Sequence, residues 1–226
     1  MLAVIVPANN EETLIGLCLR SLDAAAHWPG LQGEPVLVIV VLDTCTDDTA
    51  AVAAQAGAML ISVAARNVGI ARAEGARLAL SLGARWLAFT DADTVVAPDW
   101  LHVQTSLRSD AVCGTVGVSD WGAFGEPMRR HFDATYTDAD GHQHIHGANL
   151  GVSAQAYQRV GGFEPLASSE DVALVRALES VGARIAWSAA PRVVTSARRV
   201  FRAPDGFGAT LLRASEAHTP TTGTAP

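Results

Sequence analysis

The chain has 226 residues, of which 49% are hydrophobic and 17% charged, so it is long and apolar enough to bury the core of a folded domain. Acidic residues outnumber basic ones 23 to 16, every basic residue is arginine, and the formal charge is −7. This balance gives no general attraction for nucleic acid or for an anionic membrane, so we expect no nucleic-acid partner.

The cysteines and the apolar runs indicate the compartment. Cys18, Cys45 and Cys113 are scattered and lack metal-ligand spacing, which argues against disulfides and zinc and favours a reducing, cytoplasmic environment. The N-terminus has no basic region ahead of its apolar residues, and the longest apolar run, 36–42, is too short to span a bilayer. We therefore expect neither secretion nor a transmembrane segment.

Short apolar runs alternate with stretches of helical period over the first hundred residues. The runs predict strands at 2–6, 35–43, 58–63 and 85–91, and the periodic stretches predict helices at 11–26, 46–57 and 70–83. Strands and helices in this order are typical of an α/β fold with a Rossmann-like, mostly parallel sheet flanked by helices. Ligands of such sheets bind at the carboxyl ends of the strands.

The pattern loosens after Pro98. We expect strands at 111–119 and 144–153, a long loop at 120–142, a capped helix at 169–182, and two further strands near 184–187 and 192–197. The last residues, from about Ser215, contain too few apolar side chains to pack and are predicted to be disordered.

Two acids follow the fourth predicted strand, in the stretch "FTDADTVVAPDW". Strand alternation would direct Asp91 and Asp93 to the same side, where their charges repel. A divalent cation shared with a substrate phosphate would make the pair favourable, since Mg²⁺ and Mn²⁺ take few protein ligands. Equally, Asp91 could end the strand while Asp93 caps the next turn. Both interpretations stay open on this stretch alone.

Further acids lie at other predicted element ends. Asp43 ends the second strand, and Asn10, Glu11 and Glu12 follow the first, where they could cap a helix or bind a ribose or base. Another pair, "ED" at 170–171, occupies the first turn of the late helix, and capping explains only one of its acids. The same edge of the sheet is therefore expected to collect several carboxylates.

Six segments, in this order and spacing, resemble the motifs of family-two glycosyltransferases with the GT-A fold. They are "VIVPANNEETLIGLCLRSL", "VVLDTCTDDTA", "NVGIARAEGARLAL", "FTDADTVVAPDWL", "GANLGVSAQAYQRVGGFE" and "SSEDVALVRALESVGARI", and they cover about residues 2–190. The resemblance implies one GT-A domain over 1–214, with a nucleotide-sugar-binding half (1–98), an acceptor and catalytic half (99–214) and a disordered tail (215–226).

The resemblance also implies a role for each matched residue. A UDP- or GDP-sugar would be the donor, Glu11 and Asp43 would contact its nucleoside, and Asp91 would face the ribose. Asp93, with Asp91, would hold a Mn²⁺ or Mg²⁺ ion that neutralises the leaving diphosphate. Asp171 would be the general base of an inverting reaction, with Glu170 beside it. The remaining matched positions predicted to bind substrate are Pro7, Asn10, Arg72 and Asn149.

For Arg72, a solvated position on a helix is an equally good interpretation. Thr195 and Ser196 stand where many family members have a histidine, which makes metal dependence less secure. Arg198, with Arg199 and Arg202, could form a cationic lid over the diphosphate or an exposed basic patch.

The turn after the second predicted strand, "LDTCTDD", departs from the family as well, with Thr44 and Cys45 where an acid and a glycine are commoner. His144 and His146 could belong to a metal site, although ordinary histidines at an acceptor pocket suit the pattern better.

We consider three functions for a chain with this architecture. The first is transfer of a sugar to a small or lipid-linked acceptor. A sugar nucleotidyltransferase would need a glycine-rich basic loop after the first strand, which "PANNEE" does not provide. The third is a non-catalytic nucleotide-sugar-binding protein, which the altered turn keeps open. A homodimer is compatible with all three.

Overall fold

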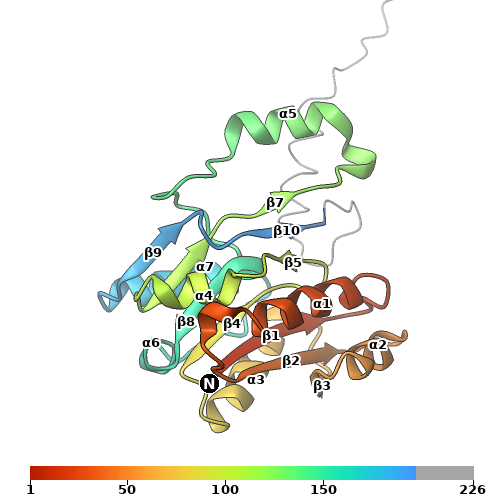
Figure 1. The fold of residues 1–226 in the computed structure, drawn as a ribbon, viewed down its shortest axis with the longest axis vertical. Coiled ribbons are helices and arrows are strands. Elements are labelled where there is room, and N and C mark those ends of the chain that lie inside the picture. The colour runs from red at the N-terminus through yellow and green to blue at the C-terminus, as the bar shows by residue number, and fades with distance from the viewer. Residues whose placement is uncertain (197–226) are drawn as a thin grey trace, which may run out of the picture.

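A computed structural model describes residues 1–196, which contain a large and a small sheet (Figure 1). The large sheet has the strand order β3-β2-β1-β4-β8-β6-β9, in which only β8 runs antiparallel to its neighbours. Its strands are β1 (Leu2–Ala8), β2 (Val36–Asp43), β3 (Met59–Val63), β4 (Trp86–Phe89), β6 (Ala111–Gly114), β8 (Leu150–Ser153) and β9 (Ile185–Ser188).

Helices cover both faces of the large sheet, which explains why its central strands are apolar throughout. In β1, Leu2, Val4 and Val6 point to one face, and Ala3 and Ile5 point to the other. The first face packs on α1 (Ile15–Ala26), α2 (Thr49–Gln55) and α4 (Trp100–Ser106). The second face packs on α3 (Val68–Ser81), α6 (Ala154–Arg159) and α7 (Glu170–Ser180).

The small sheet lies between the large sheet and an outlying helix, α5 (Figure 1). It has the order β5-β10-β7, formed by β5 (Val95–Val96), β10 (Val193–Thr195) and β7 (Gly117–Val118). Helix α5 spans Gly125–Thr135, and 3₁₀ turns occur at Pro29–Leu31, Gly122–Phe124 and Gly147–Asn149. In residues 1–196, no helix is long and apolar enough to cross a membrane.

The α/β architecture and the first four strands expected from the sequence are confirmed. The expected loop at 120–142 is wrong, because it contains α5, whose Met128 and Phe132 pack beside Phe124 at helical spacing. The expected strand at 144–153 begins only at Leu150, after a 3₁₀ turn. The glycine, tryptophan and aspartate residues of 120–142 suggested a loop and so concealed α5. The alternating histidines before Gly147 suggested a strand and so concealed the 3₁₀ turn.

The strand directions bring distant segments to one edge. The carboxyl ends of β1, β2, β4 and β6 share it, and β8 begins there because it runs antiparallel, with Leu150 opposite both Phe89 and Cys113. The turn at Gly147–Asn149 therefore lies beside the residues that follow β4.

Candidate active site

Arg72, on α3, is the centre of the site. Only 4% of its side chain is exposed, so it is not the solvated helix arginine that the sequence also allowed. Its Nη2 donates to Asp91 Oδ1 at 2.6 Å, and its Nη1 donates to Glu170 Oε1. One buried cation thus joins the segment after β4 to the first turn of α7.

The charges in this cluster depend on one another. Burial opposes the charge on Arg72, but the Asp91 and Glu170 carboxylates outweigh it and raise the pKa of the guanidinium above its ordinary value. Burial raises the pKa of Glu170, and Arg72 only partly offsets this effect. Arg72 Nε is buried without a hydrogen-bond partner among the described residues. The cluster therefore depends on Arg72 staying protonated.

Asp171 lies beside this cluster in the first turn of α7. Its Oδ2 accepts a hydrogen bond from the Gly147 N–H at 2.7 Å, and its Oδ1 accepts one from the Val172 N–H at 2.8 Å. A Cβ added at Gly147 would lie 2.3 Å from Arg72 Nη2, so only glycine fits between the arginine and the aspartate. Glu170 forms an ion pair with Arg72, whereas Asp171 accepts hydrogen bonds from backbone N–H groups.

Asp91 and Asp93 do not continue the alternation of the strand, because β4 ends at Phe89 and a turn follows. The Thr94 N–H donates to the Asp91 carbonyl at 3.1 Å within this turn. Asp93 Oδ1 lies 3.5 Å from the hydroxyls of both Thr94 and Thr195. Thr195, which stands where many relatives were expected to have histidine, therefore does reach Asp93.

These residues fit a divalent cation only in part. Carboxylate and hydroxyl oxygens suit Mg²⁺ or Mn²⁺. However, Arg72 already binds Asp91 Oδ1, and within residues 1–196 no group of three or more His, Cys, Asp and Glu side chains is arranged to hold a metal ion. A cation here would need substrate phosphate and water as its remaining ligands.

Asp43 ends β2 and holds the loop that leads into α3. Its Oδ1 accepts from the Ala65 and Arg66 N–H groups, and its Oδ2 accepts from the Asn67 N–H, at 2.8–2.9 Å. Burial works to raise the pKa of Asp43, but these hydrogen bonds outweigh it and lower the pKa below its ordinary value. Asp43 is therefore an ionised anchor for this loop.

Asn67 was missed by the sequence analysis. Its side chain caps α3 by accepting from the Ile70 N–H and donates to the Leu166 carbonyl. An asparagine just before a helix is a cap signal that could have identified it.

The segment after β1 interlocks with the turn after β2. Asn10 adopts a left-handed φ of 54° and its Oδ1 accepts from the Thr46 N–H at 2.7 Å. The buried Glu11 donates its N–H to Thr49 Oγ1, and Glu12 accepts from the Asp48 N–H. None of these residues begins a helix, since α1 starts at Ile15. Their contacts shape the turn.

Pro7 lies within β1, beyond the pairing of β1 with β4, which ends at Ile5 opposite Phe89. At Pro7 only β2 therefore neighbours β1, which is where the missing N–H of a proline is tolerated.

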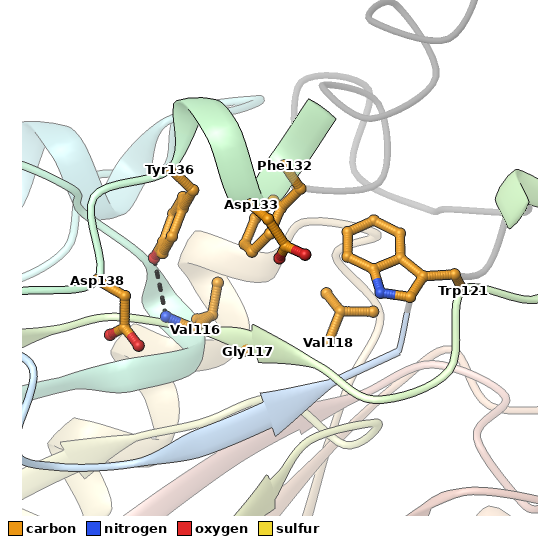
Figure 2. Close-up of a pocket in the computed structure, with 8 residues that line it drawn as sticks. All are labelled: Val116, Gly117, Val118, Trp121, Phe132, Asp133, Tyr136 and Asp138. Carbon is orange, nitrogen blue, oxygen red and sulfur yellow. Dashed lines mark hydrogen bonds between the residues drawn. The ribbon is translucent and has the colours of Figure 1, made fainter. Parts of the chain in front are cut away.

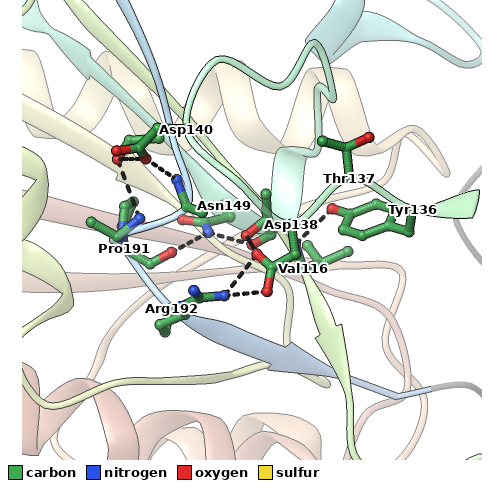
Figure 3. A network of polar contacts seen from close by, with 12 residues as sticks. Val116, Tyr136, Thr137, Asp138, Asp140, Asn149, Pro191 and Arg192 are labelled. Atoms are coloured by element: carbon green, nitrogen blue, oxygen red, sulfur yellow. Dashed lines mark hydrogen bonds and ion pairs between the residues drawn. The ribbon is translucent and has the colours of Figure 1, made fainter. Parts of the chain in front are cut away.

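Asn149 is fully buried and all of its side-chain hydrogen-bonding groups are engaged. Its Oδ1 accepts from Trp100 Nε1, and its Nδ2 donates to the carbonyls of Thr115 and Pro191, at 2.7–2.8 Å. Figure 3 shows this amide beside the Asp138–Arg192 ion pair. A Cβ at Gly114 would lie 2.1 Å from Asn149 Nδ2, so the glycine makes room for the amide. We propose that Asn149 positions the site rather than contacting substrate.

Comparison with known proteins identifies the family. The family described as Glycosyl transferase family 2 matches residues 3–161. The chain belongs to glycosyl transferase family 2. No curated protein matches the chain.

Solved glycosyltransferases share the fold. S. aureus TarS 1–349, in complex with UDP-GlcNAc, superimposes with a TM-score of 0.66 at 18% identity over 96% of this chain and 65% of that one. The mannosyltransferase PcManGT from Pyrobaculum calidifontis, in complex with GDP-Man and Mn²⁺, gives 0.67 at 20% identity over 96% and 60%. The chain thus has the GT-A fold but spans less than two thirds of the length of either relative.

One more cluster in this family-2 chain was not predicted. The Tyr136 hydroxyl accepts from the Val116 N–H at 2.8 Å and lies 3.0 Å from His146 Nε2. His144 stacks on the Tyr136 ring, with centroids 4.1 Å apart. His144 and His146 therefore belong to an aromatic cluster, and in the part of the chain that the structure describes no group of three or more His, Cys, Asp and Glu side chains around them is arranged to hold a metal ion. Arg198, Arg199 and Arg202 lie outside the described residues.

Proposed function

We propose that this chain is an inverting glycosyltransferase that uses a nucleotide diphosphate sugar and a divalent cation, Mn²⁺ or Mg²⁺. One observation carries the proposal. Arg72 makes direct contact with Asp91, 19 residues along the chain, and with Glu170, 98 residues along it, at the edge where the parallel strands end. Sheets of this kind bind their ligands at that edge.

Donor binding is assigned to the first half of the site. Glu11 and Asp43 flank the interlocked turns where the nucleoside would lie, and Asp91 and Asp93 would hold the cation. A bound cation would neutralise charge on the leaving diphosphate. Arg72 orients Asp91 through their 2.6 Å contact. The TarS structure contains UDP-GlcNAc and the PcManGT structure contains GDP-Man and Mn²⁺, so we propose a UDP- or GDP-sugar as the donor.

Asp171 is assigned the role of general base. The acceptor hydroxyl gives its proton to Asp171 while its oxygen attacks the anomeric carbon, and the bond from that carbon to the diphosphate oxygen breaks on the opposite side. Backbone N–H groups of Gly147 and Val172 hold the carboxylate in place. Glu170 is unsuited to the role because it is buried against Arg72.

Product analysis tests the proposal. The protein is incubated with UDP- and GDP-sugars and Mn²⁺, alone and with a panel of small and lipid-linked acceptors. Release of nucleoside diphosphate supports the proposal. In a parallel incubation with UTP or GTP and sugar 1-phosphates, release of pyrophosphate would indicate a nucleotidyltransferase. No product in either incubation would indicate a non-catalytic binding protein.

The base is tested by Asp171→Asn, which should lower the rate about 10²–10⁴-fold while leaving donor affinity nearly unchanged. Asp23→Asn, on a side chain that is 75% exposed, is the matched control. Normal turnover by Asp171→Asn would remove Asp171 from the chemistry.

A further inference from the structure

A cavity of about 270 Å³ lies between β7 and α5 (Figure 2). Three aromatic side chains line it, Trp121, Phe132 and Tyr136, together with the carboxylates of Asp133 and Asp138. This volume is just below the roughly 300–1,000 Å³ of pockets that enclose drug-sized ligands, so it suits a group the size of one sugar ring.

The aromatic wall is fixed before any ligand binds. The Tyr136 ring lies between Phe132 and His144, with centroid separations of 4.4 and 4.1 Å, and its hydroxyl is held by the Val116 N–H. Trp121 packs at a tilt against Phe132, 5.3 Å away. A preformed wall binds with a smaller loss of conformational entropy than a flexible one.

Carboxylates flank these rings. Asp133, on α5, is near Arg129 at 3.6 Å. Asp138 accepts from Thr115 Oγ1 and from Arg192. Burial works to raise the pKa of Asp138, but these two hydrogen bonds outweigh it and lower the pKa, so this group accepts hydrogen bonds only. Figure 2 shows the Asp133 carboxylate near the rings of Phe132 and Trp121.

A short path connects this cavity to the candidate base. Tyr136, in the cavity wall, contacts His146 Nε2 at 3.0 Å. The next residue, Gly147, donates its N–H to Asp171. The cavity therefore adjoins the segment that orients the base.

We propose that this cavity is a subsite for one sugar ring of a saccharide acceptor. The C–H groups on one face of a pyranose carry partial positive charge and pack on the negative face of an aromatic ring, here Trp121. The hydroxyls at the ring edge donate to carboxylates, here Asp133 and Asp138. A lipid phosphate would instead meet these two acids with like charge. The inference rests on the proposed function, because it assigns the acceptor class of that enzyme.

Ligand-observed saturation-transfer NMR tests the subsite without requiring turnover. The probes are methyl glycosides of glucose, galactose, mannose and N-acetylglucosamine, each measured with UDP or GDP and the diamagnetic Mg²⁺ present. At least one glycoside should bind the wild type, and Trp121→Ala should weaken its binding at least about tenfold. Trp121→Phe, which keeps an aromatic ring, should retain part of the affinity. Trp28→Ala, at another partly exposed tryptophan, is the matched control and should bind like the wild type.

Folding of each variant is checked by circular dichroism, and Asp133→Ala replaces Trp121→Ala if the latter unfolds. Equal binding by wild type and variant, or no glycoside bound by the wild type, would overturn the subsite. Binding of decyl phosphate in place of the glycosides, lost in Trp121→Ala, would overturn it in favour of a lipid. Failure of the proposed function has a separate readout, since it would appear as no diphosphate released from any nucleotide sugar.

Discussion

Replacing Arg72 by methionine tests the physical account of the site most directly. The substitution keeps much of the side-chain volume but leaves the Glu170 carboxylate, 5% exposed, without its cation. Removing one partner of a buried ion pair typically costs about 3–5 kcal/mol, because the other charge stays desolvated. For a chain of this length that corresponds to a fall in Tm of roughly 6–20 °C. Asp91 would lose less, since its side chain is 37% exposed.

Urea unfolding followed by circular dichroism measures the change in the free energy of unfolding. Arg77→Met is the matched control on the same helix, because Arg77 is 72% exposed and pairs with Glu74 at the surface, where such pairs contribute about 0–1 kcal/mol. The double variant Arg72→Met/Glu170→Gln should be more stable than Arg72→Met, since it removes the stranded charge.

The stability deficit of Arg72→Met should depend on pH, in the direction set by the pKa shift of Glu170. Without Arg72, the pKa of Glu170, which burial already raises, moves further above its unfolded value. The folded state then binds the proton more tightly than the unfolded state, so the stability deficit of Arg72→Met should shrink as the pH falls from 7 toward 5. A deficit no larger than that of Arg77→Met at pH 7 would refute the reasoning.

Three other predictions concern the same region. Gly147→Ala should lower the free energy of unfolding by about 1–3 kcal/mol and reduce turnover, because the added Cβ would lie 2.3 Å from Arg72. In the control Gly16→Ala the added Cβ meets nothing nearer than 3.5 Å, so equal melting temperatures of the two variants would contradict this prediction. Asp93→Ala should abolish the extra thermal stabilisation that Mn²⁺ adds to bound UDP or GDP, and an unchanged shift in a thermal-shift assay would exclude it from the metal site. Burial lowers the pKa of His146 to about 3, so below pH 6.5 the unfolded state binds more protons than the folded state. The free energy of unfolding, measured with urea, should therefore fall between pH 6.5 and 4, and it should fall less steeply in His146→Gln.

The fold and the edge of the sheet that carries the site could be predicted because their signals are local. The apolar runs of β1, β2 and β4 mark buried parallel strands, and Asp43 ends one of them. Since parallel strands share one carboxyl edge, acids that follow different strands are expected to meet. Arg72 indeed binds Asp91 directly, and Asp171 is next in the chain to Glu170, the other residue that Arg72 binds.

The partners of these residues could not be predicted in the same way. Arg72 is as compatible with solvent as with burial when only its helix is considered, and its partner Glu170 lies 98 positions away. Asn149 matches a substrate-binding motif, yet its side-chain amide is hydrogen-bonded to Trp100, Thr115 and Pro191. Nothing in the local sequence of Asn149 indicates these contacts.

The sequence by itself determined the order of strands and helices over the first hundred residues, the family resemblance and the set of acids expected at the ligand edge, because periodicity and element ends depend on neighbouring residues. Only the tertiary structure decided which acid is paired, which is held by backbone donors, and that α5 closes an aromatic cavity over β7. The physical reason is that burial and hydrogen bonding are set by groups brought together from distant parts of the chain, and these fix the charge and the orientation of each side chain.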